Sequence, residues 1–240
     1  MLVYDALIDW YALLDPRVDH HDEATAYGAA LVRGVVGDAR TLLELGAGAG
    51  NNAWFLKQRF ACTLTDLSPK MLALSRTQNP DCEHLEGDMR TLRLGREFDA
   101  VLVHDAVCYM TTRAQLREAA LTAFVHLRSG GAAVFAPDCT RESFEEGATL
   151  LECDDGGRSL RGLEWSWDAD PSDETYQVEY ALLLRDGAVV RSVHDHHEEG
   201  LFSRATWVEV LSSVGFQVET FARPLDDEGE FDEVFLCRKP

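Results

Sequence analysis

An apolar run that ends in an acid and is followed by three alternating glycines constrains this chain more than any other feature. Residues 41–45 are long enough for one strand, Gly46, Gly48 and Gly50 follow, and an amphipathic helix begins after them. Glycine permits a positive φ and lets a ligand approach the backbone closely. The helix that follows offers its N-terminal N–H groups to negative charge. This order of strand, turn and helix predicts the first unit of a nucleotide-binding α/β sheet.

The glycine spacing and the acid narrow the choice of nucleotide. A dinucleotide fingerprint, G-x-G-x-x-G, requires glycine at position 51, where this chain has Asn51. The carboxylate of Glu44 repels a pyrophosphate but suits a ligand that carries an ammonium or a sulfonium group. An NAD(P) oxidoreductase therefore stays only a distant alternative.

Strands and helices alternate through the first 140 residues. Strands expected at 61–65, 82–86, 98–105 and 132–137 are separated by segments with helical spacing. Such alternation predicts a parallel sheet with right-handed crossovers. Asp66 ends the second strand about 20 residues after the glycine turn, where an acid receives the ribose hydroxyls of a nucleotide.

The pattern changes after residue 140. Three antiparallel strands with turn signals between them are expected at 160–168, 175–185 and 188–198. A helix over 204–214, strands at 216–221 and 232–237, and a solvated acidic turn at 225–230 complete the chain. We expect a helical cap at 1–36 beginning with a helix over 2–14, a nucleotide-binding domain formed by 37–140 and 201–240, and an antiparallel β insertion or lid at 141–200. Two copies could pair through the edge of this insertion as a homodimer.

Composition limits the partners. The chain has 22 basic and 42 acidic residues and a formal net charge of −20. Nucleic-acid binding depends on Lys and Arg that neutralise phosphates, so DNA and RNA are not expected as partners. No signal peptide and no apolar run of membrane-spanning length is apparent, so no membrane partner and a cytoplasmic location are expected.

Three motifs together resemble those of class I S-adenosylmethionine-dependent methyltransferases. They are E-L-G-A-G-A-G at 44–50, T-D-L-S-P-K-M-L at 65–72, and G-D-M at 87–89. Within this class, the stretches 87–101 and 196–203 and the β insertion look most like small bacterial enzymes that dimethylate amino sugars. The resemblance implies a Rossmann-like fold, a mostly parallel seven-stranded sheet with helices on both faces, and S-adenosylmethionine as cofactor.

The resemblance and the strand ends together predict the cofactor site. By resemblance, Asp88 accepts a hydrogen bond from the adenine amino group and Met89 packs on the ring. The full set expected to bind the cofactor is Glu44, Gly46, Ala47, Gly48, Gly50, Asn51, Asp66, Leu67, Met71, Gly87, Asp88, Met89 and His104.

The run after the fourth strand supplies the candidates for catalysis, because ligands bind outside the carboxyl ends of such strands. His104 is the first candidate for a general base, Asp105 for its orienter or for a binder of the acceptor's ammonium group, and Tyr109 is a third candidate. The amino-sugar enzymes carry a different run here, rich in Phe and Ser, so this segment leaves the acceptor open. Residues expected to contact the acceptor are Tyr4, Tyr11, Cys108, His194 and His196.

No metal site is expected. On a strand, His194 and His196 share a face while His197 points away, and no further pair of ligands with suitable spacing is evident. The sequence thus predicts methyl transfer to a small-molecule acceptor, first of all at an amine nitrogen. An O-methyltransferase of the same fold and a non-catalytic protein that binds S-adenosylmethionine are the alternatives.

Overall fold

A seven-stranded sheet forms the centre of the computed structural model, which describes residues 1–224 and 231–240. Its strand order is β10-β11-β5-β4-β1-β2-β3. The strands are β1 (Thr41–Leu45), β2 (Ala61–Asp66), β3 (Glu83–Glu86), β4 (Phe98–His104), β5 (Leu127–Ala136), β10 (Gln217–Pro224) and β11 (Phe231–Arg238). Strands β1 to β5 pair in parallel, and β11 runs antiparallel to both β5 and β10. The predicted mostly parallel seven-stranded sheet is confirmed.

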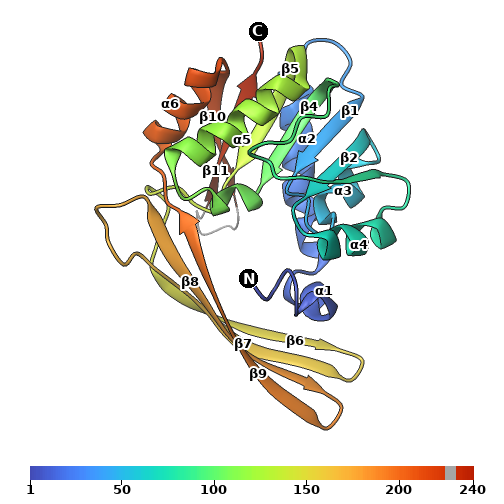
Figure 1. Ribbon diagram of the computed structural model, residues 1–240, viewed down its shortest axis with the longest axis vertical. Coiled ribbons are helices and arrows are strands. Elements are labelled where there is room, and N and C mark those ends of the chain that lie inside the picture. Colours follow the sequence, from blue (N-terminus) through green and yellow to red (C-terminus); the bar gives the residue numbers. More distant parts are fainter. Residues whose placement is uncertain (225–230) are drawn as a thin grey trace.

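Helices cover both faces of this sheet (Figure 1). They are α2 (His21–Gly34), α3 (Asn51–Leu56), α4 (Pro69–Gln78), α5 (Arg113–His126) and α6 (Arg204–Val214). Neighbouring residues of one strand point to opposite faces. Leu42 therefore packs with α2 and α3, whereas Leu43 and Leu45 pack with α5 and α6. Both faces are buried, which is why β1 and β4 read as continuous apolar runs.

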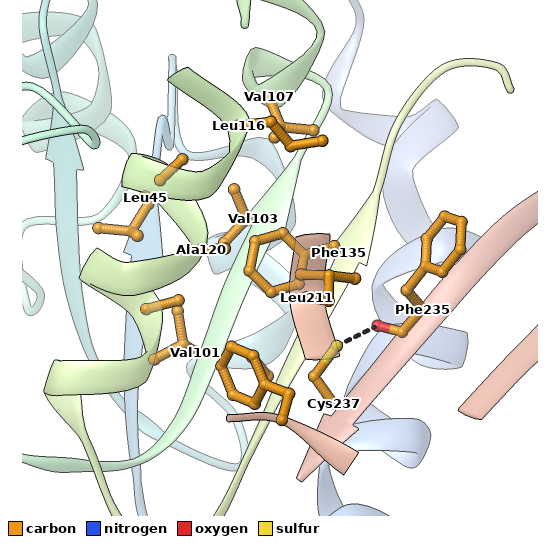
Figure 2. Packing of buried hydrophobic residues seen from close by; sticks show 14 of the residues in the cluster. Leu45, Val101, Val103, Val107, Leu116, Ala120, Phe135, Leu211, Phe235 and Cys237 are labelled. Carbon is orange, nitrogen blue, oxygen red and sulfur yellow. Dashed lines mark hydrogen bonds between the residues drawn. The ribbon is translucent and has the colours of Figure 1, made fainter. Parts of the chain in front are cut away.

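The core on the α5 and α6 side is rich in aromatic and branched side chains (Figure 2). Phe135 and Phe235 of adjacent strands are fully buried there, and the Trp207 ring of α6 stacks on Phe235 with 5.1 Å between centroids. Leu211 of the same helix is also fully buried. This packing holds α6 and the two C-terminal strands against the parallel part of the sheet.

A separate four-stranded antiparallel sheet projects from this body (Figure 1). Its strands follow one another as β6 (Gly147–Asp155), β7 (Arg158–Trp167), β8 (Thr175–Asp186) and β9 (Val189–Gly200). Three of them were expected from the sequence, and β6 was not. Pairing of two copies through this sheet stays a prediction, as does the assignment of 141–200 to a domain of its own.

The N-terminal segment is less helical than expected. Helix was predicted over 2–14, but the chain is helical only in a 3-10 turn at Ile8–Trp10 and in α1 (Tyr11–Leu14). The N–H groups of Leu2 and Val3 instead donate to the Asp195 carboxylate of β9, at 2.5 and 3.0 Å. This tertiary contact overrides the local helical spacing and ties the N-terminus to the four-stranded sheet.

Three smaller features complete the description. A second 3-10 turn (Arg17–His20) precedes α2, and a third (Ala106–Tyr109) follows β4. Across residues 1–224 and 231–240, every helix is too short or too polar to span a bilayer. The acidic turn expected at 225–230 lies outside the described residues.

We predict that Leu211→Ala lowers the free energy of unfolding by about 2–5 kcal/mol, because it leaves a cavity in a fully buried position. Urea denaturation measures this change. Glu209→Ala on the same helix is the control: that side chain is 74% exposed, so its loss should change stability by less than about 0.5 kcal/mol. Equal stability of the two variants would contradict the described packing of α6.

Candidate active site

A cavity of about 540 Å³ opens at the carboxyl ends of β1, β2 and β4. Its walls come from the glycine turn, from the segments that follow β2, β3 and β4, and from the N-terminal residues. The predicted site residues that line it are Glu44, Gly46, Ala47, Gly48, Asn51, Asp66, Leu67, Met71, Gly87, Asp88, Met89, His104, Asp105, Tyr109, Tyr4 and Tyr11. The structure therefore brings together most of the residues that the sequence singled out.

The glycine turn lies flat against the neighbouring strand. The N–H groups of Gly46 and Ala47 donate to the carbonyl oxygen of Thr65 in β2, at 2.9 and 2.8 Å. Gly46 has a φ of 76°, and a Cβ at this position would collide with the Ala106 side chain and lie 2.9 Å from Cε of Met89. Only glycine fits this conformation and this space. The turn therefore packs closely against Ala106 and Met89, which leaves no room for a side chain at this position.

Asp66 joins the glycine turn to the start of α4. Its Oδ2 accepts a hydrogen bond from the N–H of Gly48 at 2.8 Å, and its Oδ1 accepts one from the N–H of Ser68 at 2.7 Å. Ser68 in turn caps α4, because its hydroxyl accepts from the N–H of Met71. Burial raises the pKa of Asp66. The carboxylate is fixed from both sides, and each oxygen keeps a lone pair for a ligand hydroxyl.

Asp88 lies after β3 and pairs with a neighbour. The guanidinium of Arg90 donates to both of its carboxylate oxygens, at 2.5 to 3.0 Å, and this pairing lowers the pKa of Asp88. Both residues line the cavity. Asp88 is therefore held as a carboxylate, a hydrogen-bond acceptor, beside the buried side chain of Met89.

Glu44 is a buried acid without a complete set of partners. Only 3% of it is exposed, and its Oε2 has no hydrogen-bond partner in the described part of the chain. Burial raises the pKa of Glu44 to about 8. An unpartnered carboxyl oxygen in a cavity wall is costly unless a ligand satisfies it. It fits a ligand that carries an ammonium group, such as S-adenosylmethionine.

His104 lies between two carboxylates at the end of β4. Its Nε2 is 2.6 Å from Oδ1 of Asp105 and 3.4 Å from Oε2 of Glu23. Burial favours the neutral ring, but the charge of Asp105 and these hydrogen bonds outweigh it and raise the pKa of His104 well above its usual value. Nε2 thus carries a proton that it donates to Asp105. This geometry does not favour His104 as a general base.

A second histidine that sequence reasoning missed completes this charged cluster. His20 contacts Oδ1 of Asp15 and Oε1 of Glu23, both at 2.6 Å. Burial opposes the charge, but the two hydrogen bonds raise the pKa of His20 to about 10. Asn52 donates to Oε1 of Glu23 at 2.9 Å. The sequence signal that could have revealed this cluster is the run of histidines and acids at 20–23, at the start of α2.

Asp138 was also missed. It follows β5, the strand next to β4, so its place at the same edge of the sheet was predictable. Its side chain hydrogen-bonds that of Asp105, and burial with the nearby charges of Asp105 and Glu199 raises the pKa of Asp138 well above its usual value. Burial by itself would raise the pKa of Asp105. The positive charge of His104 outweighs this effect and keeps the pKa of Asp105 low. Asp138 therefore holds the proton of this pair, and Asp105 stays a carboxylate.

A chain of hydroxyl groups lines the side of the cavity that faces the four-stranded sheet. Tyr4 and Tyr109 lie 2.9 Å apart through their hydroxyls, and the Tyr109 hydroxyl is 2.9 Å from Nδ1 of His197. Nε2 of His197 contacts Asp195, which also holds the N-terminus. Burial raises the pKa of Tyr109 well above its usual value. Its hydroxyl is therefore a neutral donor and acceptor.

Four predicted site residues do not line the cavity. Gly50 is the N-cap residue of α3, and Ser75 and Asn79 leave no room for a side chain there. His194 and His196 both contact Glu179 on the four-stranded sheet. Cys108 is buried, and its Sγ accepts a hydrogen bond from the N–H of Asp138 at 3.2 Å.

Cys108 also lies within 4.8 Å of carboxylate oxygens of Asp138 and Glu199, a distance that a shared metal ion would allow. Burial raises the pKa of the Cys108 thiol well above its usual value. Metals bind the thiolate, so this environment works against a metal at these three residues.

Comparison with known proteins places this cavity in a family. A model described as a methyltransferase domain matches residues 42–131. The dTDP-3-amino-3,4,6-trideoxy-alpha-D-glucopyranose N,N-dimethyltransferase of Streptomyces venezuelae is 31% identical over 80% of this chain and 81% of the relative. The dTDP-3-amino-3,6-dideoxy-alpha-D-glucopyranose N,N-dimethyltransferase of Streptomyces fradiae is also 31% identical, over 84% of this chain and 79% of the relative.

Solved structures agree with these relatives. DesVI of Streptomyces venezuelae superposes with a TM-score of 0.83 at 26% identity and covers 99% of this chain and 97% of its own. CalS10 of Micromonospora echinaspora, an amino pentose methyltransferase whose structure holds S-adenosylmethionine, superposes with a TM-score of 0.80 at 27% identity. That match covers 92% of this chain and 91% of CalS10.

We predict that Asp66→Ala weakens S-adenosylhomocysteine binding at least about tenfold, because it removes the acceptor that the N–H groups of Gly48 and Ser68 hold in place. Calorimetric titration measures the affinity. Asp81→Ala is the matched control, since Asp81 is an exposed acid that pairs with Lys57 outside the cavity. Equal affinity of both variants and the parent chain would contradict the assignment.

We predict opposite effects of Glu44→Gln on stability and on binding. The folded-state pKa of Glu44 is raised to about 8, so the folded ligand-free chain retains a proton that the unfolded chain loses above its ordinary pKa. Glu44 therefore destabilises the chain increasingly as the pH rises toward 8. The variant should become more stable than the parent over this range, on the order of 1–3 kcal/mol at pH 8.

The same variant should bind S-adenosylhomocysteine more weakly, because Gln lacks the charge that pairs with an ammonium group. Thermal unfolding between pH 5 and about 8 and calorimetry at the upper end give both readouts. A stability difference that does not change with pH would show that Glu44 is not a group with a raised pKa.

Proposed function

The chain belongs to the class I S-adenosylmethionine-dependent methyltransferases, and from this premise we propose that it methylates an amine nitrogen of a small, amino-sugar-like molecule. Both curated relatives described above are named as N,N-dimethyltransferases of amino sugars. The observation in this chain that carries the proposal is the Asp105 carboxylate. Its side chain is 52% exposed, into the cavity, and it lies between a protonated histidine and a protonated aspartic acid.

Different residues of the chain would bind different parts of the cofactor. S-adenosylmethionine, when bound, supplies a methyl group that its sulfonium already activates for transfer. Asp66 would hold the ribose hydroxyls, Asp88 and Met89 the adenine, and Glu44 the ammonium group. The glycines of the turn, which carry no side chain, would let the ligand come close to the backbone. Because the methyl group is already activated, positioning and exclusion of water are what remains for the protein.

The acceptor end of the cavity suits an amine better than a hydroxyl. A neutral amine attacks with its own lone pair, whereas a hydroxyl gains from a general base. Nε2 of His104 already donates to Asp105, and the Tyr109 hydroxyl has a raised pKa. Asp105 would accept an N–H of the acceptor and so orient the nitrogen, with the hydroxyls of Tyr4 and Tyr109 as further partners.

We further propose that residues 1–36 cap the cavity and that the segment 141–200 closes it from the other side. Met1, Tyr4 and Tyr11 line the cavity, which supports the first part. The contact of Asp195 with the N–H groups of Leu2 and Val3 supports the second. Displacement of the N-terminal residues would then open the site to ligands.

The experiment that tests the proposed function is a comparison of two acceptors that differ in one atom. The chain is incubated with S-adenosylmethionine and either the methyl glycoside of a 3-amino-3-deoxyhexose or that of the parent hexose, and S-adenosylhomocysteine release is measured. We expect turnover of the amine and none of the hydroxyl compound. Turnover of the hydroxyl compound alone would favour O-methylation instead.

We predict that Asp105→Asn lowers kcat/KM for an amine acceptor at least about tenfold while the affinity for S-adenosylhomocysteine changes little, because the charge that orients the acceptor is lost. Asp105 has a φ of 39°, and Asn is among the residues that tolerate a positive φ, so the substitution preserves the backbone. Steady-state kinetics and calorimetry separate the two effects. Full activity of the variant would exclude Asp105 from acceptor binding.

A further inference from the structure

Carboxylates outnumber cationic side chains in the cavity wall. Six carboxylate residues line it, against one lysine, one arginine and the two histidines with raised pKa, His20 and His104. All four of these cationic side chains are already paired with acids: Lys70 with Asp5 and Arg90 with Asp88, both at 2.5 Å, His20 with Asp15 and Glu23, and His104 with Asp105. A phosphate group that entered this space would meet no unpaired cationic side chain among the described lining residues.

The cofactor accounts for only part of this negative charge. Glu44, Asp66 and Asp88 lie where the cofactor's ammonium, ribose and adenine would bind. Asp105 remains at the acceptor end. Behind it, Asp138 and Glu199 are near neighbours, and the Tyr176 hydroxyl donates to Glu199 at 2.5 Å. The acceptor thus faces the Asp105 carboxylate, which attracts a cation and repels an anion.

The neighbouring cleft offers no spare guanidinium either. It lies beside Thr111 and contains Arg113 and Arg141. Arg113 binds both carboxylate oxygens of Glu174, and Arg141 donates to the carbonyl groups of Pro171 and Asp173. Residues 225–230, outside the described part of the chain, contain no Lys or Arg in the sequence.

An independent observation also calls for a ligand that donates hydrogen bonds. Oδ1 of Asn52 has no hydrogen-bond partner in the described part of the chain, and Asn52 is only 4% exposed and lines the cavity. Its Nδ2 donates to Oε1 of Glu23, which leaves Oδ1 as a free acceptor beside the charged cluster. An ammonium or amine group satisfies such an oxygen, whereas a phosphate oxygen does not.

We propose that the acceptor of this chain is a phosphate-free amine that enters the cavity as an ammonium ion and loses one proton to water before its nitrogen lone pair reacts, and that the site excludes a nucleoside diphosphate. The proposal rests on the proposed N-methyltransferase function and makes its substrate class more specific. It separates this chain from the two relatives described above, whose names give dTDP-linked sugars as their substrates. Here the acids at the acceptor end and the paired cations of the wall select against the pyrophosphate.

The first test is a titration of dTDP into the chain saturated with S-adenosylhomocysteine, followed by calorimetry. The Streptomyces venezuelae N,N-dimethyltransferase described above serves as the positive control. We expect no saturable binding to this chain under conditions in which the control binds. Micromolar binding of dTDP to this chain would overturn the proposal. Because this readout does not require turnover, it decides the proposal even if the proposed function fails.

Variants of one ion pair test the physical reason. Asp5→Asn removes the partner of Lys70 and so frees a cation in the cavity wall. This variant should bind dTDP measurably, at least several-fold more tightly than the upper limit that the titration sets for the parent chain. Asp9→Asn, an exposed acid that does not line the cavity, is the control and should gain none. Unchanged affinity in Asp5→Asn would show that charge is not what excludes the nucleotide and would also overturn the proposal.

The third test compares acceptors that carry the same amine. The dTDP-linked 3-amino-3,6-dideoxyglucose of the Streptomyces fradiae relative and the methyl glycoside of that sugar are offered at equal concentrations. The proposal predicts a kcat/KM at least about tenfold higher for the methyl glycoside. A preference for the dTDP-linked compound would overturn it. Absence of turnover with either compound, while S-adenosylhomocysteine still binds, would count against the proposed function and leave the dTDP titration to decide this inference.

Discussion

The two hydrogen bonds that Asp66 accepts hold the cofactor side of this molecule together. One comes from Gly48 in the turn after β1 and the other from Ser68 at the start of α4. The carboxylate can only reach both because β1 and β2 are parallel neighbours and the turn is pressed against Thr65. The φ of Gly46 and the absence of its Cβ make that contact possible. Asp66 and Gly46 thus fix the loops at the carboxyl ends of β1 and β2 in the positions that form the cavity wall.

Charge compensation is the second constraint on the site. Glu23 and Asp105 share His104, while Asp15 and Glu23 share His20, so three carboxyl groups and two imidazole groups stabilise one another. A single unpaired charge here would be costly. The network fixes Asp105 as an ion and Asp138 as an acid. It also keeps a proton on His104, an arrangement that does not favour the role of general base that the residue type suggests.

Sequence reasoning found the parts of the site that depend on local order. Strand ends, the glycine turn and the cap at Ser68 follow from neighbouring residues, so Glu44, Asp66 and Asp88 were all predicted and all line the cavity. Glu23, His197 and Asp138 were missed because their roles depend on contacts with distant segments. The helix predicted from residue 2 was wrong for the same reason, since Asp195 binds the N–H groups that would begin it. His194 and His196 stand out in the sequence, but β9 places them beside Glu179 instead.

A crystal structure of the chain with S-adenosylhomocysteine tests the central claim most directly. The claim is that Asp66, Glu44 and Asp88 bind the ribose, the ammonium group and the adenine of one cofactor at the carboxyl ends of the strands. We predict both ribose hydroxyls within hydrogen-bonding distance of the Asp66 carboxylate, and the cofactor's ammonium group next to the unpartnered oxygen of Glu44. A ribose bound elsewhere, with the hydrogen bonds of Asp66 to Gly48 and Ser68 unchanged and both of its oxygens free of ligand, would contradict the account.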